Sequence, residues 1–348
     1  MLKGRRLISI LLIVLITVGS ITGCSNNDST NGAADSTNGA AEDSKKDWPS
    51  VLKVGASQPG GYSFLNASGM CEIINATIEG VTATPTTGGQ VICLNNCNSG
   101  EFDLGLACNY TEVDARLGND PFEEPLTNVS SIGNCYPSPW HIITLEESNI
   151  NSIEDLRGKD FSPGTQGMGG EVMARRVLSE YGMTYDDLGK MTLTGYEDGA
   201  SLMKDGHIEA FFIQMLAPSA PFVDVGTFKP LKILSVGEDR MDEICEKYNM
   251  FPGVIPAGTY PGQKEDVMAP SATNEFIAGN HLPEDLVYEI TKAFWENIDQ
   301  VVALSEGFKP YFKVEQALDG LGLPLHKGAY KYYVEIGLDV PEHLKPAY

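Results

Sequence analysis

The chain has 348 residues and a formal net charge of −23, with 24 Lys and Arg residues against 47 Asp and Glu residues. Such an acidic chain offers no basic stripe to meet phosphates, so we expect no nucleic-acid partner. Its length is sufficient for two lobes that each bury a core.

The N-terminus is typical of a bacterial lipoprotein signal. Basic residues open the chain, and the apolar run that follows, 7–18, is too short for a comfortable membrane span. Small residues then precede Cys24. We expect a signal peptide over 1–23, lipidation of Cys24 and an extracytoplasmic chain anchored to the cell membrane. An uncleaved membrane anchor is the alternative.

Residues 24–49 are predicted to hold the lipidated cysteine and a flexible tether. The sequence DSTNGAA occurs twice in tandem, at 28–34 and 35–41. No aromatic residue follows the signal before Trp48, so this stretch cannot bury a core.

The first part of the body alternates strands and helices. Strands are predicted over 51–57, 81–87 and 102–108, with one helix that ends near Glu79 and another that ends at Gly100. This βαβαβ order predicts a parallel sheet with right-handed crossovers.

The same order restarts near residue 150. Ser152 is a candidate N-cap, with Asp155 three positions later. A short strand, an amphipathic helix, a second helix and an apolar strand are predicted next, over 159–162, 171–182, 200–206 and 208–213, and a helical C-terminal part begins at 284. The chain is therefore predicted to form an α/β clamshell with a ligand cleft between two βαβ lobes. Lobe I would comprise 50–139 plus 255–348, and lobe II 140–254.

Six cysteines follow Cys24, and the extracytoplasmic compartment permits disulfides. Cys93 and Cys97 have helical i, i+4 spacing, which suits one helix face better than a bridge to each other. Zinc-ligand spacing is missing, so we expect no metal site. Buried thiols and disulfides both remain open for Cys71, Cys93, Cys97, Cys108, Cys135 and Cys245.

The stretch 162–178, SPGTQGMGGEVMARRVL, contains a Gly-rich turn that leads into a helix. It lacks the Lys and the Ser or Thr that follow the glycines of a phosphate-binding P-loop, and it has the acidic Glu171 near the position that a phosphate would occupy. It also does not match GxGxxG, the dinucleotide-binding pattern. No local catalytic motif occurs, and the five histidines have no ligand spacing; His141 is the one beside a candidate cleft loop. We therefore expect no cofactor and no enzymatic activity.

Six stretches, in order over about residues 51–340, resemble the TAXI family of solute receptors that serve TRAP (tripartite ATP-independent periplasmic) transporters. They are VGASQPGGYSFLNA, TTGGQVICLNNCNSGEFDLGL, SIEDLRGKDFSPGTQGMGGEVMARRVL, MKDGHIEAFF, PAGTYPGQKEDV and GLPLHKGAYKYYVEIG. The resemblance implies a type II periplasmic-binding-protein fold, whose cleft closes on a small molecule and delivers it to an ion-gradient-driven permease. Known members bind small carboxylates such as glutamate.

Three loops depart from the family pattern together. The family's Gly-Ser-Gly-Thr is here 167–170, Gly-Met-Gly-Gly, without hydroxyls; Gly-Gly-Ser is 88–90, Gly-Gly-Gln; and Gly-x-Pro is 216–218, Leu-Ala-Pro. In addition, the loops expected at the cleft contain no Lys, Arg, Asp or Glu; they are 55–63, 86–90, 107–110, 135–140, 163–170 and 213–218. The sequence thus predicts a solute that is less charged, or more apolar, than glutamate.

The ligand-binding residues predicted on these loops are glycines, neutral polar residues, aromatic residues and one methionine. They are Ser57, Gly60, Gly61, Tyr62, Thr87, Gly89, Gln90, Asn109, Tyr136, Thr165, Gln166, Gly167, Met168, Gly169, Gly170 and Gln214. We expect backbone N–H groups of the Gly-rich loop and a helix N-terminus to hold one acidic or carbonyl end of the solute.

The function predicted from the sequence is therefore capture of a small organic acid for TRAP membrane subunits by a monomeric, lipid-anchored receptor. A receptor for an ATP-driven (ABC) importer and a stand-alone sensor are the alternatives within this class. An enzyme on the same fold and a surface adhesin are weaker alternatives.

Overall fold

The computed structural model describes residues 47–166 and 168–347, which belong to one compact unit, Asp47–Tyr348. The expected signal peptide, Cys24, most of the tether and Gly167 lie outside the described residues. Among the helices described, none is both long enough and apolar enough to cross a membrane.

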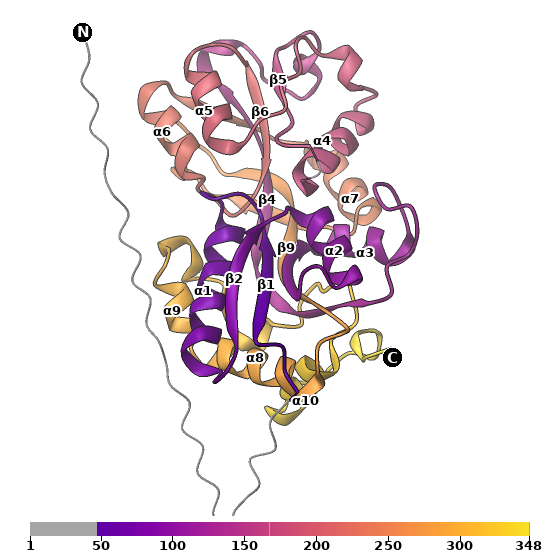
Figure 1. Ribbon diagram of the computed structural model, residues 1–348. Coiled ribbons are helices and arrows are strands. Elements are labelled where there is room, and N and C mark those ends of the chain that lie inside the picture. Colours follow the sequence, from indigo (N-terminus) through magenta and orange to yellow (C-terminus); the bar gives the residue numbers. More distant parts are fainter. Residues whose placement is uncertain (1–46, 167, 348) are drawn as a thin grey trace, which may run out of the picture. The chain divides into compact units, whose positions relative to one another are not determined.

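The first sheet forms from the N-terminal part of the body as the sequence predicts (Figure 1). β1 (Val51–Ala56) pairs in parallel with β2 (Thr82–Thr87) on one side and with β3 (Leu104–Cys108) on the other. The crossovers contain α1 (Tyr62–Thr77) and α2 (Gln90–Ser99). Every residue of β3 is buried, as expected for a strand inside a sheet that is covered on both faces.

Two long strands, for which the sequence analysis predicted nothing, connect the first sheet to the second. β4 (Val129–Leu145) runs antiparallel to β9 (Val267–Gly279) as far as Pro139, and from Trp140 onward it pairs with β6 (Ala210–Gln214). The register of β4 shifts at two points before Pro139, which bends the strand as bulges do. β9 also pairs with β3 and with β8, Phe251–Ile255.

The second sheet contains the predicted short strand, β5 (Phe161–Ser162), which lies parallel to β6. β7 (Leu231–Leu234) and β6 both run antiparallel to β4. The helices of this part are α4 (Gly169–Glu180), α5 (Tyr196–Lys204), α6 (Ala220–Phe228) and α7 (Glu238–Lys247). We call the part built on the first sheet lobe I and the part built on the second sheet lobe II.

Two local expectations about lobe II are wrong. Ser152 makes no side-chain cap; instead the Asp155 carboxylate accepts hydrogen bonds from the backbone N–H groups of Asn151 and Ser152, and only a 3₁₀ turn, Glu154–Leu156, forms. The next predicted helix, α5, begins at Tyr196 rather than near 200. Glu197 and Asp198 lie in its first turn, where their negative charges favour a helix N-terminus.

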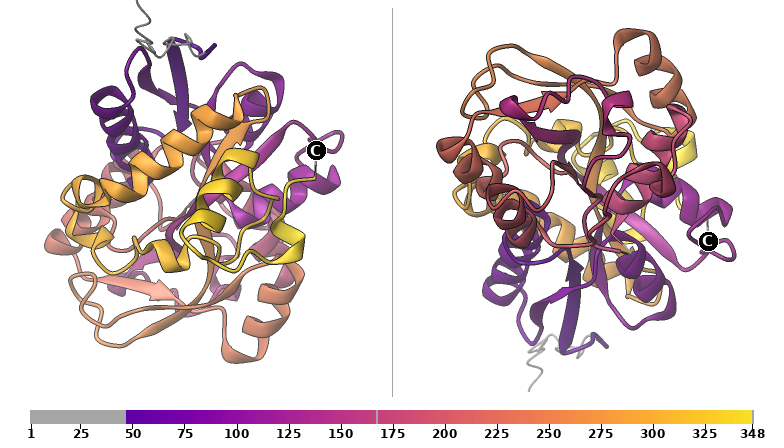
Figure 2. Two further views of the ribbon diagram at one scale, coloured as in Figure 1. Left: turned by 90° about the horizontal axis from the view of Figure 1, so that it is seen from below. Right: turned by 90° about the horizontal axis from the view of Figure 1, so that it is seen from above.

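The C-terminal part returns to lobe I as helices, as predicted. α8 (Glu284–Glu296) and α10 (Lys327–Glu335) pack side by side (Figure 2). α3 (Asn109–Leu117) and α9 (Ile298–Val302) complete the α-helices of the described residues. Short 3₁₀ turns also occur, at Glu146–Ser148, Tyr185–Asp187, Glu306–Phe308, Val314–Gln316 and Glu342–Leu344.

Separate apolar cores lie in the two lobes. Ile255, Tyr260, Ala269 and Ala272, which follow residue 254, join the core of lobe II. Lobe boundaries at 139/140 and 254/255 therefore remain a proposal.

The six described cysteines are buried free thiols. Burial raises the pKa of the Cys93 thiol to about 12, which keeps it protonated and unreactive. The described residues contain no cluster of His, Cys, Asp and Glu suited to a metal ion.

Candidate functional site

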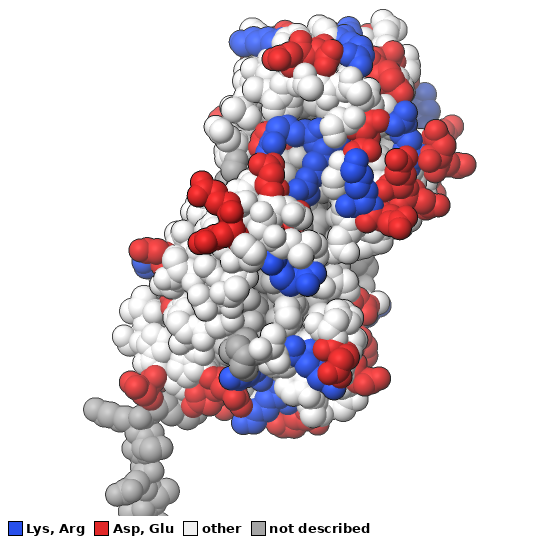
Figure 3. All heavy atoms as spheres, turned by 90° about the vertical axis from the view of Figure 1, so that its right-hand side faces the viewer, with Lys and Arg blue, Asp and Glu red and all other residues white. Residues whose placement is uncertain are grey.

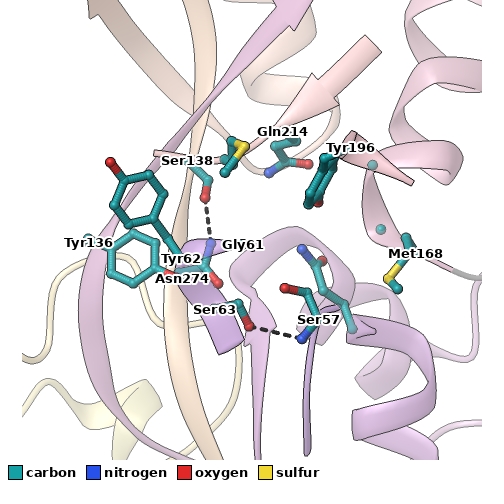
Figure 4. Close-up of a pocket in the computed structure, with 14 residues that line it drawn as sticks. Ser57, Gly61, Tyr62, Ser63, Tyr136, Ser138, Met168, Tyr196, Gln214 and Asn274 are labelled. Atoms are coloured by element: carbon teal, nitrogen blue, oxygen red, sulfur yellow. Dashed lines mark hydrogen bonds between the residues drawn. The ribbon is translucent and has the colours of Figure 1, made fainter. Parts of the chain in front are cut away.

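A cavity of about 30 Å³ lies between the two lobes, where the predicted loops meet (Figure 4). Lobe I contributes the end of β1, the starts of α1 and α2, and the bent part of β4. Lobe II contributes the starts of α4 and α5 and the end of β6. The lining residues are Ser57, Gly61, Tyr62, Ser63, Gln90, Tyr136, Ser138, Met168, Gly169, Gly170, Tyr196, Gln214, Met215 and Asn274.

The structure brings many of the predicted site residues together in this lining. They are Ser57, Gly61, Tyr62, Gln90, Tyr136, Met168, Gly169, Gly170 and Gln214. Tyr62 and Tyr136 lie on one side of the cavity, and Met168 and Tyr196 on the other (Figure 4). Whether these residues bind a solute stays a prediction.

Other predicted residues do not line this cavity. Gly60 lines an adjacent, larger one. Gly89 is the N-cap of α2, with φ 82°, and Thr87 and Gln166 are exposed. Thr165 is half-buried outside the lining, and its hydroxyl oxygen is buried without a hydrogen-bond partner among the described residues.

Asn109 is absent from the lining because its side chain is already occupied. Its Nδ2 donates to the Asn249 carbonyl at 2.9 Å, and its Oδ1 accepts from the Thr273 N–H at 3.3 Å. His141, beside the predicted loop, also lies outside the lining. It is fully buried, and burial lowers its pKa to about 3.

Five lining residues were missing from the predicted set. Ser63, Ser138 and Met215 lie inside the uncharged loops but were not selected. Tyr196 and Asn274 come from the start of α5 and from β9, which gave no local signal of a cleft. Asn274 reaches the cavity because β9 pairs with β4, opposite Tyr136, and sequence periodicity does not specify such a long-range register.

The cavity is uncharged but polar. Among the described residues that line it there is no Lys, Arg, Asp, Glu or His. Six of them carry hydroxyl or amide groups: Ser57, Ser63, Gln90, Ser138, Gln214 and Asn274. Some of these groups bond to each other: Asn274 Nδ2 donates to Ser138 Oγ, and the Ser57 N–H donates to Ser63 Oγ (Figure 4).

The hydroxyl of Tyr136 is a buried polar group that could bond to a ligand. The residue is 1% exposed, and its hydroxyl has no hydrogen-bond partner among the described residues. Burial raises the pKa of this hydroxyl well above its usual range, so the group is a neutral donor and acceptor. A buried hydroxyl without a partner has a free-energy cost that a ligand atom can remove.

A hydrogen-bond network beside the cavity joins the lobes. The Tyr110 hydroxyl, from lobe I, lies 2.7 Å from Gln214 Oε1 of lobe II and 3.2 Å from Gln90 Oε1. Thr111 Oγ1 donates to Gln90 Oε1 at 2.9 Å, and Gln90 Nε2 lies 3.0 Å from Cys108 Sγ. Tyr62 adds a further link between the lobes, because its hydroxyl donates to the Pro218 carbonyl at 3.1 Å.

Ion pairs also connect the lobes. Arg176 on α4 lies 2.6 Å from Asp114 on α3, and Arg175 lies 3.4 Å from Asp120. Figure 3 shows the side of the molecule on which α3, α4 and α7 lie, where Lys and Arg side chains gather among Asp and Glu. The structure therefore has the lobes in contact around the cavity.

The fold resembles that of solved solute-binding proteins. PhnD1 from Prochlorococcus marinus (MIT 9301), in complex with methylphosphonate, is 14% identical, with a TM-score of 0.51 over 83% of this chain and 98% of that chain. The alkanesulfonate-binding protein SsuA from Xanthomonas axonopodis pv. citri, bound to MOPS, is 14% identical, with a TM-score of 0.46 over 82% and 84%. A putative L-cystine ABC transporter protein from Listeria monocytogenes is 17% identical, with a TM-score of 0.47 over 76% and 98%.

The architecture is thus the mixed α/β fold of periplasmic solute-binding proteins. The chain belongs to the NMT1-like family, whose match covers residues 54–337.

Proposed function

We propose that the chain is the extracytoplasmic, solute-binding receptor of a TRAP-type, ion-gradient-driven importer, of the TAXI group, and that it captures a small organic acid by lobe closure. Family membership over most of the body supports this proposal. The observation that carries it is the cavity between the lobes, whose described lining residues are uncharged and include Tyr136 and the first residues of α4.

These groups can hold a carboxylate without a cationic side chain. Gly169 and Gly170 open α4, and the first N–H groups of an α-helix have no acceptor within the helix. Together with the helix dipole they favour a negative group at this end. The Tyr136 hydroxyl and the amides of Gln90 and Gln214 would supply further hydrogen bonds.

Closure would accompany capture. The present cavity holds about one water molecule, so an organic acid has to enter while the lobes are apart. Bending of β4 and β9, which run between the sheets, would allow this movement. The contacts Tyr110–Gln214 and Arg176–Asp114 would form again in the closed state, and a solute that makes more contacts in that state shifts the equilibrium toward it.

The proposed receptor would be anchored to the membrane and would deliver its solute to membrane subunits. Lipidation of Cys24 would anchor the receptor to the outer side of the cell membrane as a monomer, and TRAP membrane subunits would accept the solute unchanged. Reconstitution with these subunits distinguishes the main alternative: uptake should require an ion gradient, whereas an ABC importer would require ATP.

We expect the solute to stabilise the folded protein and the Tyr136 hydroxyl to contribute to its binding. In thermal unfolding of residues 47–348 against monoacids, dicarboxylates, keto acids and amino acids, a ligand at 100 times its Kd should add about 2.7 kcal/mol to the free energy of unfolding. Tyr136→Phe retains the ring that packs against Tyr62 and Phe308 and removes only the hydroxyl. Calorimetry should show affinity lower by about 3- to 10-fold, the value of one hydrogen bond. Stability without solute should be equal or higher, because the variant no longer buries a hydroxyl that has no partner among the described residues.

Tyr330→Phe on α10 serves as the control, with affinity unchanged. If no compound stabilised the protein, the receptor proposal would lose its support and an adhesin would gain weight. Conversion of a bound compound into a product would identify an enzyme instead.

A further inference from the structure

A second, larger cavity adjoins the inner one. Its volume is about 470 Å³, and its lining is Pro59, Gly60, Gly61, Tyr62, Phe64, Leu65, Ser68, Ala220 and Ser305. Gly61 and Tyr62 line both cavities, so the two spaces lie next to each other at these residues. Pockets for small organic ligands occupy about 300–1,000 Å³, a size that the second cavity reaches and the inner cavity of about 30 Å³ does not.

The two cavities differ in chemistry. The second cavity has apolar walls from Phe64 and Leu65, and each of its two serine hydroxyls makes one local hydrogen bond. Ser68 Oγ donates to the Phe64 carbonyl at 2.9 Å, and Ser305 Oγ accepts from the Gly307 N–H at 3.2 Å. The inner cavity is instead lined by several amides and hydroxyls, and by Tyr136, whose buried hydroxyl has no hydrogen-bond partner among the described residues. A solute that fills both spaces needs a polar end for the inner cavity and an apolar end for the second.

Tyr62 lines both cavities. Its ring packs against Tyr136 and Phe308, with centroid distances of 6.4 and 5.3 Å. Its hydroxyl reaches lobe II at Pro218. Because this contact spans the lobes, it would form as they close, and the ring would then lie beside the middle of the bound solute.

Charged groups begin only beyond the second cavity. Gly60 and Ala220 are shared with a third hollow, which is also lined by Glu197, Lys204 and Asp224. Lys204 forms an ion pair with Asp224. The negative charge of Glu197 is therefore not neutralised within this group of three residues. An anionic group at the far end of a solute would meet this carboxylate, whereas an uncharged end would not.

We propose that the second cavity is the tail subsite of the solute site, so that the solute is a monocarboxylic acid with an uncharged aryl or branched-alkyl tail. This inference rests on the proposed function. The carboxylate lies at the start of α4, and the tail extends past Tyr62 to Phe64, Leu65 and Ala220.

A matched ligand series tests the tail subsite by calorimetry. Propionate, 3-phenylpropionate, 4-methylpentanoate and glutarate are titrated into residues 47–348. Burial of the phenyl or isopropyl group that these acids add to propionate should make the two tailed acids about 10- to 100-fold tighter than propionate. Glutarate, which has a second carboxylate in place of the tail, should gain nothing.

Ala220→Phe is the matching variant, because Ala220 is exposed at the start of α6 and an added ring can fill the cavity without disturbing a core. It should remove the advantage of the tailed acids and change propionate affinity by less than about threefold. Ala76→Phe, an exposed position on α1 outside the cavities, controls for the added ring and should leave every affinity unchanged.

The outcomes separate the two proposals. If propionate binds and the tails add nothing, or if Ala220→Phe leaves their advantage intact, the tail subsite is wrong and the receptor proposal stands. If glutarate is the tightest ligand, the tail subsite is also wrong. If no acid of this series or of the broader panel binds, both proposals fail.

Discussion

Gly169→Ala should hold the lobes apart and lower solute affinity by about 5- to 150-fold, the equivalent of 1–3 kcal/mol of overpacking. A Cβ atom on Gly169 of lobe II would lie 2.5 Å from the Tyr110 hydroxyl oxygen and closer still to Gln90 Oε1, both of lobe I. The side chain of Gln90 can rotate away, but Gln90 itself lines the cavity. Either response therefore weakens the closed, solute-bound state.

The same substitution should not reduce the stability of the protein. Gly169 does not have the positive φ that would strain an alanine, and it lies at the first position of α4. Alanine favours a helix over glycine by up to about 1 kcal/mol. Thermal unfolding without solute should consequently show an equal or higher midpoint, while small-angle scattering should show a larger radius of gyration.

Gly170→Ala is the matched control for this prediction. A Cβ atom on Gly170 would lie 3.9 Å from the Gln214 backbone nitrogen and 4.0 Å from Gln214 Cβ, which are ordinary contacts. Its effect on affinity should stay below about threefold, although the helix gains the same alanine. Equal losses in the two variants would show that closure does not depend on the close approach at Gly169.

Glu275→Gln should flatten the dependence of stability on pH. Glu275 on β9 and Glu112 on α3 are both fully buried and share Ser131 Oγ, which lies 3.2 Å from Glu275 Oε2 and 3.0 Å from Glu112 Oε2. Thr273 Oγ1 donates to Glu275 Oε1 at 2.6 Å. Burial raises the pKa of both carboxyls, and the neighbouring Glu112 raises that of Glu275 further. The pair therefore retains a proton that solvated carboxylates would have lost.

The direction of the pH effect follows from these raised pKa values. In the unfolded chain both groups titrate near pH 4.3. Above that pH the folded state binds more protons, so the free energy of unfolding falls as the pH rises toward the folded pKa, by about 1.4 kcal/mol per pH unit for each extra proton. Burial also raises the pKa of the adjacent thiols, Cys108 and Cys135, which stay neutral over this range.

Urea unfolding between pH 5 and 8 measures this slope. The side-chain amide that Glu275→Gln introduces can accept from Thr273 and donate toward Ser131 or Glu112, yet it has no proton to lose. The slope should therefore decrease, and stability at pH 8 should be maintained or increased. Glu243→Gln, which removes an exposed carboxylate from α7, should leave the slope unchanged. An unaltered slope in Glu275→Gln would contradict the shared proton.

Elements that are specified by interactions between residues close in the sequence formed largely as predicted. The strands β1, β2 and β3 were predicted because apolar runs and turn residues specify them locally, and Gly100 ends α2 as expected. Residues from several of the uncharged loops lie together in the cavity, and none of its described lining residues is charged. Their role in binding stays a prediction. Short-range competition caused the errors at Ser152 and at the start of α5, where nearby carboxylates determine the local turn and helix start.

Contacts between segments that are far apart in the sequence could not be predicted from it. Asn274 lines the cavity, Asn109 bonds to Thr273 instead, and Glu112 lies beside Glu275 because β9 pairs with both β3 and β4 in one particular register. Tyr196 reaches the cavity from the start of α5, which belongs to lobe II. The free state of the six thiols likewise depends on where each strand and helix packs.

The sequence by itself determined the alternation of strands and helices, the parallel pairing of β1 with β2 and β3, and the absence of charge on the loops expected at the cleft. It did not predict that β9 joins this sheet antiparallel to β3. Periodicity and turn chemistry act within a few residues, so one chain is sufficient to show them. Only the tertiary structure decided which of those loop residues face the cavity, how the lobes contact each other and that a larger apolar space lies beyond Tyr62. These features arise from pairings across more than a hundred residues, and packing of the whole chain selects them.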